Sequence, residues 1–213
     1  LTFSPDGKRT VYAAKLGNKW RVVLDGDEDK EYDGLGEDSI HFSPNSSRLA
    51  YVAKVGRNWL VVANGVPGKT YGGENNLIFS PDSKRMAYGA RRGRKWLVVI
   101  DHKEQKKYDR VDGIRFSPDS KRVAYGARRK GRWMVVVDRR EGKEYGAIRI
   151  ESIVFSPDSR RFAYGAKKMR QWVVVEGNRE SRAYDAVRDI VYSPDSKRLV
   201  YAALRDGKWV TVV

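Results

Sequence analysis

A segment of 37 or 39 residues recurs along this chain of 213 residues, and the repetition restricts the folds that are open to it. Six copies start with an aromatic residue, then Ser-Pro, then Asp or Asn, at Phe3, Phe42, Phe79, Phe116, Phe155 and Tyr192. In every copy a Trp follows this aromatic residue after 17 positions, which accounts for all six Trp. Repeats of this length are typical of solenoids, propellers and arrays.

Within one repeat, residues 76–110, short runs of aromatic and β-branched residues alternate with Pro, Asp, Ser and Gly. This pattern predicts strands and turns and gives no support for helices. The sequence Ser-Pro-Asp-Ser predicts a turn between strand A, residues 77–80, and strand B, residues 84–91. Strand C, residues 96–100, is a continuous apolar run that we expect to be buried on both faces, and residues 106–110 are expected to form a short strand D.

Six such units predict an all-β, six-bladed β-propeller built from four-stranded antiparallel blades. A β-sandwich is the alternative, but it would not repeat its sequence six times. We expect one propeller domain over residues 1–213, with blades at about 1–37, 38–75, 76–112, 113–151, 152–188 and 189–213. The last blade should lack its outer strand, which would leave residues 209–213 as an exposed edge available for self-association or for pairing with a following segment.

The motif Phe-Ser-Pro-Asp-Gly-Lys-Arg at residues 3–9, with its five relatives, resembles the WD40-like repeat of TolB-type propellers. It lacks the Gly-His and Trp-Asp pairs of true WD40 repeats, although Asp25, Asp101 and Asp138 still close strand C. The resemblance implies a non-catalytic or accessory domain, because relatives serve as interaction scaffolds or as gating domains fused to peptidases. It also weakly suggests the bacterial periplasm, and the localisation is otherwise open.

Residue types needed for catalysis are scarce. The two His, His41 and His102, lie outside the repeated positions, Cys is absent, and there is no nucleophile elbow, zinc-protease motif or phosphate loop. We therefore expect no enzyme activity and no cofactor. No apolar run is long enough for a membrane helix and no signal peptide is recognisable, so we expect no membrane insertion.

We also predict no metal site, because the one calcium-like pattern is incomplete. Asp25, Asp27 and Asp29 match the start of a calcium loop, but Lys30 stands where Gly is required and Gly36 stands where a bidentate Glu is needed. These three Asp therefore form only a weak calcium candidate. An acidic, solvated hairpin is the simpler interpretation.

The formal charge of +16 is concentrated in the turns between strands B and C. These six turns hold 17 of the 43 Lys and Arg residues and a single acid, so the rest of the chain is neutral. Repeats three to five are the most basic and supply the candidate anion-binding residues, which are Arg91, Arg92, Arg94, Lys95, Arg128, Arg129, Lys130, Arg132, Lys167, Lys168 and Arg170. Exposed cations also keep hairpins soluble, so a purely solvated surface is the competing interpretation.

The six Trp allow two interpretations. An aromatic residue at the same register of each blade most simply fills the gap between neighbouring blades. It could also stack on bases or sugars near the basic turns. We expect the structural role for the whole set, which is Trp20, Trp59, Trp96, Trp133, Trp172 and Trp209.

Three functions remain open at this point. The first is a scaffold or accessory domain that binds a protein through one face of the disc. The second is a module that binds nucleic acid or an acidic polysaccharide through the basic turns between strands B and C, with affinity that falls steeply with salt. The third is a lectin-like or small-ligand site at the centre or between blades.

Overall fold

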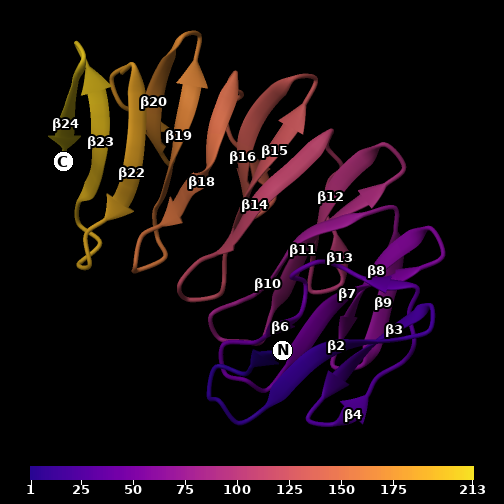
Figure 1. Cartoon of the computed structure of the whole chain (residues 1–213). Coiled ribbons are helices and arrows are strands. Elements are labelled where there is room, and N and C mark those ends of the chain that lie inside the picture. The colour runs from indigo at the N-terminus through magenta and orange to yellow at the C-terminus, as the bar shows by residue number, and fades with distance from the viewer. The chain divides into compact units, whose positions relative to one another are not determined.

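The computed structural model describes residues 1–213 and contains 24 strands and no helix. No helix that could span a membrane is present. The strands form six antiparallel sheets, which we call blades one to six in chain order (Figure 1). The chain divides into two compact units, Leu1–Gln105 and Lys106–Val213, and each contains three blades. The all-β class and the four-stranded antiparallel repeat are thus confirmed, while the extent of a single domain stays a prediction.

The first unit contains blades one to three. Blade one comprises β1 (Thr2–Phe3), β2 (Thr10–Leu16), β3 (Lys19–Leu24) and β4 (Asp27–Glu28). Blade two comprises β5 (Gly34–Leu35), β6 (His41–Phe42), β7 (Leu49–Val55), β8 (Asn58–Ala63) and β9 (Val66–Tyr71). Here β5 and β6 both pair with β7, so they are two pieces of one interrupted strand A. Blade three comprises β10 (Glu74–Phe79), β11 (Met86–Arg92), β12 (Lys95–Ile100) and β13 (Lys103–Glu104).

The second unit contains blades four to six. Blade four comprises β14 (Arg110–Phe116), β15 (Val123–Arg129), β16 (Arg132–Val137) and β17 (Arg140–Glu141). Blade five comprises β18 (Ala147–Phe155), β19 (Phe162–Lys168), β20 (Gln171–Glu176) and β21 (Arg179–Glu180). Blade six has only β22 (Ala186–Tyr192), β23 (Leu199–Arg205) and β24 (Lys208–Val212), and β24 pairs with β23 alone. The predicted absence of an outer strand from the last blade is confirmed.

Strands B and C form the core because both of their faces are apolar. In blade four, Ala124, Ala127, Met134 and Val136 are fully buried. The Ala and Gly residues of strand B alternate with large side chains, which lets neighbouring blades approach closely. Buried clusters accordingly join blade one to two, two to three, four to five and five to six. These clusters hold each three-blade unit together.

The repeated Ser-Pro-Asp turn is fixed by its own side chains. In blade three the Ser80 hydroxyl donates to Asp82 Oδ1 at 2.6 Å and accepts from the backbone N–H of Arg85 at 2.9 Å. Ser83 ends the turn with φ of 64°, a conformation also found at the equivalent residue of every other blade. Ser and Asp side chains that bond to nearby backbone groups favour such turns. The predicted turn between strands A and B is therefore present.

Strand D and the Trp position differ from the sequence prediction. In blade three the outer strand is Lys103–Glu104 and not residues 106–110, because it ends after two residue pairs with β12. The tyrosine beyond it joins strand C by a single bridge in other blades, as between Trp133 and Tyr145. Strand A of blade three runs over Glu74–Phe79 and contains a bulge between Asn75 and Ile78, and strand B runs over Met86–Arg92. The Trp lies at the second residue of strand C, as Trp96 does in β12, and not at the first.

Candidate binding surface on the B–C hairpins

Tight turns present the candidate cations at the ends of strands B and C. In blade four the turn between β15 and β16 consists of Lys130 and Gly131, with φ values of 49° and 80°. Two successive positive φ values define the hairpin turn that matches the natural twist of antiparallel strands. Met169 begins the equivalent turn of blade five with φ of 56°. The predicted hairpins are therefore present, and their basic side chains project from both strands and from the turn.

Two of the seven cations predicted in the second unit are neutralised within their own blades. Arg129 binds Glu141 at 3.0 Å and Glu144 at 3.1 Å, and Lys168 binds Glu180 at 3.0 Å. Lys106 and Arg129 hold the pKa of Glu141 at about 2. Lys168, with the Tyr145 hydroxyl, does the same for Glu180. These ion pairs fix the side chains of Arg129 and Lys168 within their own blades.

The side chains of the other five candidates of the second unit form no ion pair with a carboxylate: Arg128, Lys130, Arg132, Lys167 and Arg170. The backbone N–H of Lys130 donates to the Asp109 carboxylate at 2.7 Å, so one acid lies at this hairpin. All are exposed except Lys167, which is half-buried and has its Nζ 5.9 Å from the ring centre of Trp172. Arg132 donates only to the backbone oxygen of Glu144, at 3.2 Å. The hairpins of blades four and five, which share a buried core, therefore carry an excess of unneutralised positive charge.

The four candidates of the first unit lie on the single hairpin of blade three. Arg92 binds Glu104 at 2.9 Å. Arg91 lies across the backbone of Gly72 and donates to its carbonyl oxygen. Arg94 and Lys95 are exposed at the turn. Arg91 is therefore held in place beside a pocket of the first unit, and only part of this hairpin is open to a partner.

The repeated Trp side chains lie at the borders of the blades. Trp59, Trp133 and Trp172 are half-buried and pack against the cores that join their blades to the next. Trp20 and Trp96 are also half-buried, whereas Trp209 on the open strand β24 is 44% exposed. In blades one and two a lysine of strand B lies over the ring, 5.5 Å away at Trp20 and 5.7 Å at Trp59. The structural role predicted for these rings fits these positions and stays a prediction.

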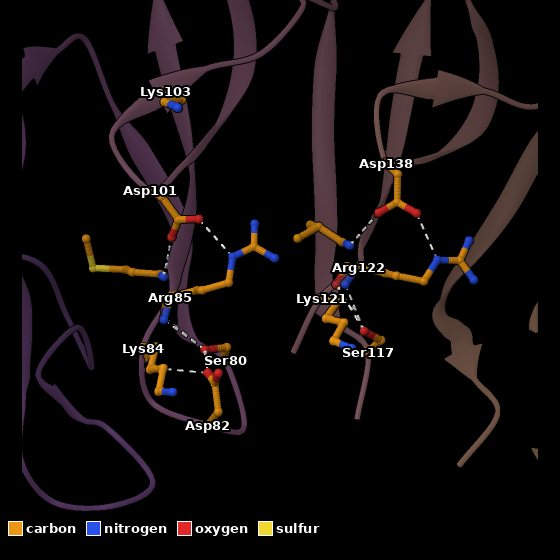
Figure 2. A network of polar contacts seen from close by, with 12 residues as sticks. Ser80, Asp82, Lys84, Arg85, Asp101, Lys103, Ser117, Lys121, Arg122 and Asp138 are labelled. Atoms are coloured by element: carbon orange, nitrogen blue, oxygen red, sulfur yellow. Dashed lines mark hydrogen bonds and ion pairs between the residues drawn. The ribbon is translucent and has the colours of Figure 1, made fainter. Parts of the chain in front are cut away.

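An arginine that the sequence analysis did not single out connects neighbouring blades. Arg122 Nε binds Asp138 at 2.8 Å, and its Nη1 donates to the backbone oxygens of Ser159 and Arg160 in the next blade at 3.1 and 3.0 Å. Figure 2 shows Arg122 pointing toward Asp138 and, in blade three, Arg85 pointing toward Asp101. The signal was the recurrence of this Arg six residues after the aromatic residue of every repeat.

Tyrosine pairs form a second connection that sequence reasoning missed. The tyrosine beyond strand D of one blade contacts the strand B tyrosine of the next edge to face, as Tyr145 does Tyr164 with ring centres 6.3 Å apart. The Tyr145 hydroxyl also reaches Glu180 at 2.9 Å. The same arrangement recurs at Tyr32–Tyr51, Tyr71–Tyr88 and Tyr184–Tyr201. Within the second unit, Tyr108 and Tyr125 form a similar edge-to-face pair. Most of the repeated polar side chains therefore form contacts that hold neighbouring blades together.

The three residues of the weak calcium candidate point to different partners. Asp25 accepts from the backbone N–H of Thr10 at 2.7 Å and binds Arg9 at 2.8 Å. These contacts lower the pKa of Asp25. Asp29 accepts from the Tyr51 hydroxyl at 2.7 Å, and Asp27 lies in the two-residue strand β4. No group of three or more potential ligands gathers anywhere in the structure.

The sequence matches no protein-family model and no curated protein. Solved structures do resemble the chain. The match to the Dos1 propeller covers 98% of this chain and 66% of the Dos1 chain, with 12% identity and a TM-score of 0.51. TolB from Acinetobacter baumannii covers 95% of this chain with 15% identity and a TM-score of 0.46. The propeller domain of the Trilobed protease from Pyrococcus furiosus covers 95% with 11% identity and a TM-score of 0.47.

The chain spans 60% of the TolB chain, so these similarities concern the fold and not the activity of a whole protein. At identities of this level the Dos1 propeller shows architecture alone. The repeated antiparallel blades agree with that architecture. The chain therefore has a β-propeller fold, which is the fold that its sequence resemblance to TolB-type, WD40-like repeats implies.

Proposed function

We propose that the chain is a non-catalytic scaffold that binds the acidic surface of a protein partner through the B–C hairpins of blades four and five. The observation that carries this proposal is the group of five cations on those two hairpins, defined above, whose side chains form no ion pair with a carboxylate. A surface of this kind attracts an oppositely charged partner and accelerates its encounter.

The non-catalytic part of the proposal is supported by the structural contacts of the repeated polar residues. Ser117 is fully buried and bonds Asp119 and the backbone of Arg122, which is the role of a turn former. The repeated Arg and Tyr residues join adjacent blades. A catalytic site needs a nucleophile or base with a substrate position beside it, and these repeated groups are already engaged.

The pattern of charge favours a protein over a polymer of phosphates or sulfates. Glu141, Glu144 and Glu180 lie among the cations and bind Arg129 and Lys168. These ion pairs interrupt the positive surface and leave no continuous row of free cations for a uniformly anionic polymer, whereas a protein surface can place single acids opposite separate cations. We therefore rank an anionic polymer second, supported by the same five unneutralised cations.

The test compares two variants with equal loss of charge. In the hairpin variant the five cations Arg128, Lys130, Arg132, Lys167 and Arg170 are changed to Gln. In the control variant five exposed cations at the opposite ends of the sheets of blades four to six are changed to Gln: Arg139, Arg140, Arg160, Arg179 and Lys197. Both variants and the parent are measured against an array of short acidic peptides, against heparin and against duplex DNA.

We expect the parent to bind a subset of acidic peptides selectively, the hairpin variant to lose this binding, and the control to keep it. Heparin and DNA should bind weakly and without selectivity. Tight polymer binding that falls steeply between about 50 and 200 mM salt would favour the second candidate. Equal loss in both variants would show that only the net charge matters and would refute the assignment to these hairpins.

A further inference from the structure

A pocket of about 610 Å³ lies in the first unit where blades two and three meet. Its lining includes the start of strand A in each blade, together with the indoles of Trp59 and Trp96. Its volume falls in the range typical of sites for small organic ligands. It is separate from the hairpin surface proposed above, which belongs to the second unit.

Glu74, in the wall of this pocket, departs from the repeat. Glu74 pairs with Ala90 of strand B, and the residue at the same register is Leu35 in blade two, Val111 in blade four, Ile148 in blade five and Val187 in blade six. All four are apolar, and the last three are buried. In blade three this position holds a carboxylate. Both carboxylate oxygens of Glu74 and the Oδ1 of the adjacent Asn75 are buried without any hydrogen-bond partner. Buried acceptors normally have partners, so three orphaned oxygens in one wall indicate a missing donor.

The charge at the pocket is acidic although the chain is strongly basic. Glu37 and Asp38 line it beside Glu74, and Arg91 is the one Lys or Arg residue in its lining. The guanidinium of Arg91 is directed to the carbonyl oxygen of Gly72. Desolvation lowers the pKa of His41, which therefore adds little positive charge at neutral pH. Acidic residues around two indoles favour a ligand with N–H donors, positive charge and an apolar stem.

We propose that this pocket binds an organic cation, an alkylammonium or alkylguanidinium group, with Glu74 as its ion-pair partner and Asn75 as a second acceptor. Trp59 and Trp96 would enclose the stem of the ligand. Such a group can come from a free amine or from a Lys or Arg side chain of a peptide. Both sources share the chemistry that the pocket recognises.

Binding should be coupled to release of a proton. Burial raises the pKa of Glu74 to about 8, so its carboxyl group is protonated at neutral pH when the pocket is empty. A bound cation stabilises the carboxylate and expels the proton. The other titratable groups in the lining of the pocket, or close enough to Glu74 to interact with its charge, are Glu37, Asp38, His41, Tyr71, Tyr88 and Arg91.

The probe pair that tests the proposal is N-acetylarginine methylamide and N-acetylnorleucine methylamide, which share an apolar stem and differ in the guanidinium. Free agmatine and a short Arg-containing peptide distinguish the two sources of the group. Calorimetry in two buffers of different ionisation enthalpy measures affinity and proton release together. Glu74→Gln is compared with Glu151→Gln, an exposed acid of strand A in blade five.

We expect the arginine derivative to bind, the norleucine derivative not to bind, and close to one proton to be released at pH 7. Glu74→Gln should weaken binding about ten-fold or more and abolish proton release, whereas Glu151→Gln should change neither. Thermal unfolding of Glu74→Gln shows whether the variant is folded, and Glu74→Asp provides a second folded test. No binding by any cationic probe, equal binding of norleucine, or full affinity and proton release in Glu74→Gln would overturn the proposal.

Discussion

Replacing Glu74 by Gln should remove a pH-dependent loss of stability from the first unit. Glu74 has a pKa of about 8 in the folded chain, against 4.5 as its ordinary value, because burial disfavours its charged form. Between these two pH values the folded state holds a proton that the unfolded state has released. The free energy of unfolding therefore falls as pH rises from 4.5 to 8. Above pH 8, Glu74 causes no further change in it.

The size of this effect follows from the shift. Each pKa unit corresponds to about 1.4 kcal/mol, so the shift destabilises the unit at pH 9 by about 3 to 5 kcal/mol. Glu74→Gln keeps the shape of the side chain and removes the ionisation. The variant and the parent should be equally stable at pH 4, and the variant should be more stable by about 3 to 5 kcal/mol at pH 9.

Denaturant unfolding followed by circular dichroism at pH 4, 6, 8 and 9 measures this difference. Other titrating groups cancel because only the difference between the two proteins is used. Glu151→Gln serves as the control and should show no pH-dependent gain, since its side chain is 71% exposed. A constant difference between parent and Glu74→Gln across this range would refute the buried, unpartnered carboxylate.

Three further predictions concern the repeated framework. Arg122→Ala should lower the free energy of unfolding by about 2 kcal/mol, because it removes charged hydrogen bonds to two carbonyl oxygens of the next blade. The control Arg160→Ala, at an exposed turn, should lower it by less than about 0.5 kcal/mol. Trp133→Ala should cost about 3 kcal/mol in chemical unfolding, since the ring packs against the core of blades four and five, and a loss under about 1 kcal/mol would contradict a structural role. The pKa of Glu141 is lowered to about 2, so this carboxylate should stabilise the fold fully above pH 4.5 and lose that contribution as pH falls toward 2. Glu141→Gln should therefore show a smaller loss of stability between pH 4.5 and 2 in an acid titration followed by circular dichroism.

Features that depend on local chemistry could be predicted from the sequence. The Ser-Pro-Asp turn is encoded by residues whose own side chains close it, as Ser80 and Asp82 do. The B–C hairpins were predicted because Lys130 and Gly131, with their counterparts, interrupt two apolar runs at a fixed distance. The short last blade followed from counting the predicted strands. Each of these signals is contained within a few neighbouring residues.

Features that depend on the next blade could not be predicted in this way. The period reveals that Tyr145 and Tyr164 recur, but their contact arises only when two blades stack. Strand D was predicted at the wrong residues because it is only two residue pairs long. The tyrosine that follows it was assigned to the strand, but it belongs to the contact between blades. The pairing of Arg129 with Glu141 was missed because strand C lies between their strands in the sequence.

Glu74 was missed for a different reason. Its position in the repeat is visible in the sequence, but a lone acid at the start of a strand resembles an ordinary surface residue. Only the burial of its equivalents Val111 and Val187 marks the position as an apolar one. Counting back five positions from the aromatic residue also gives an acid, Glu37, in the second repeat, so only the pairing of strands A and B identifies Glu74 as the exception.

We propose that the repeated residues hold the blades together while the basic hairpins of blades four and five bind the partner. Hydrogen exchange of the parent with and without the tightest acidic peptide from the array tests it most directly. We predict protection concentrated at residues 128–132 and 167–171. Protection at the Ser-Pro-Asp turns, such as residues 117–120 and 156–159, with none at the hairpins, would contradict the claim.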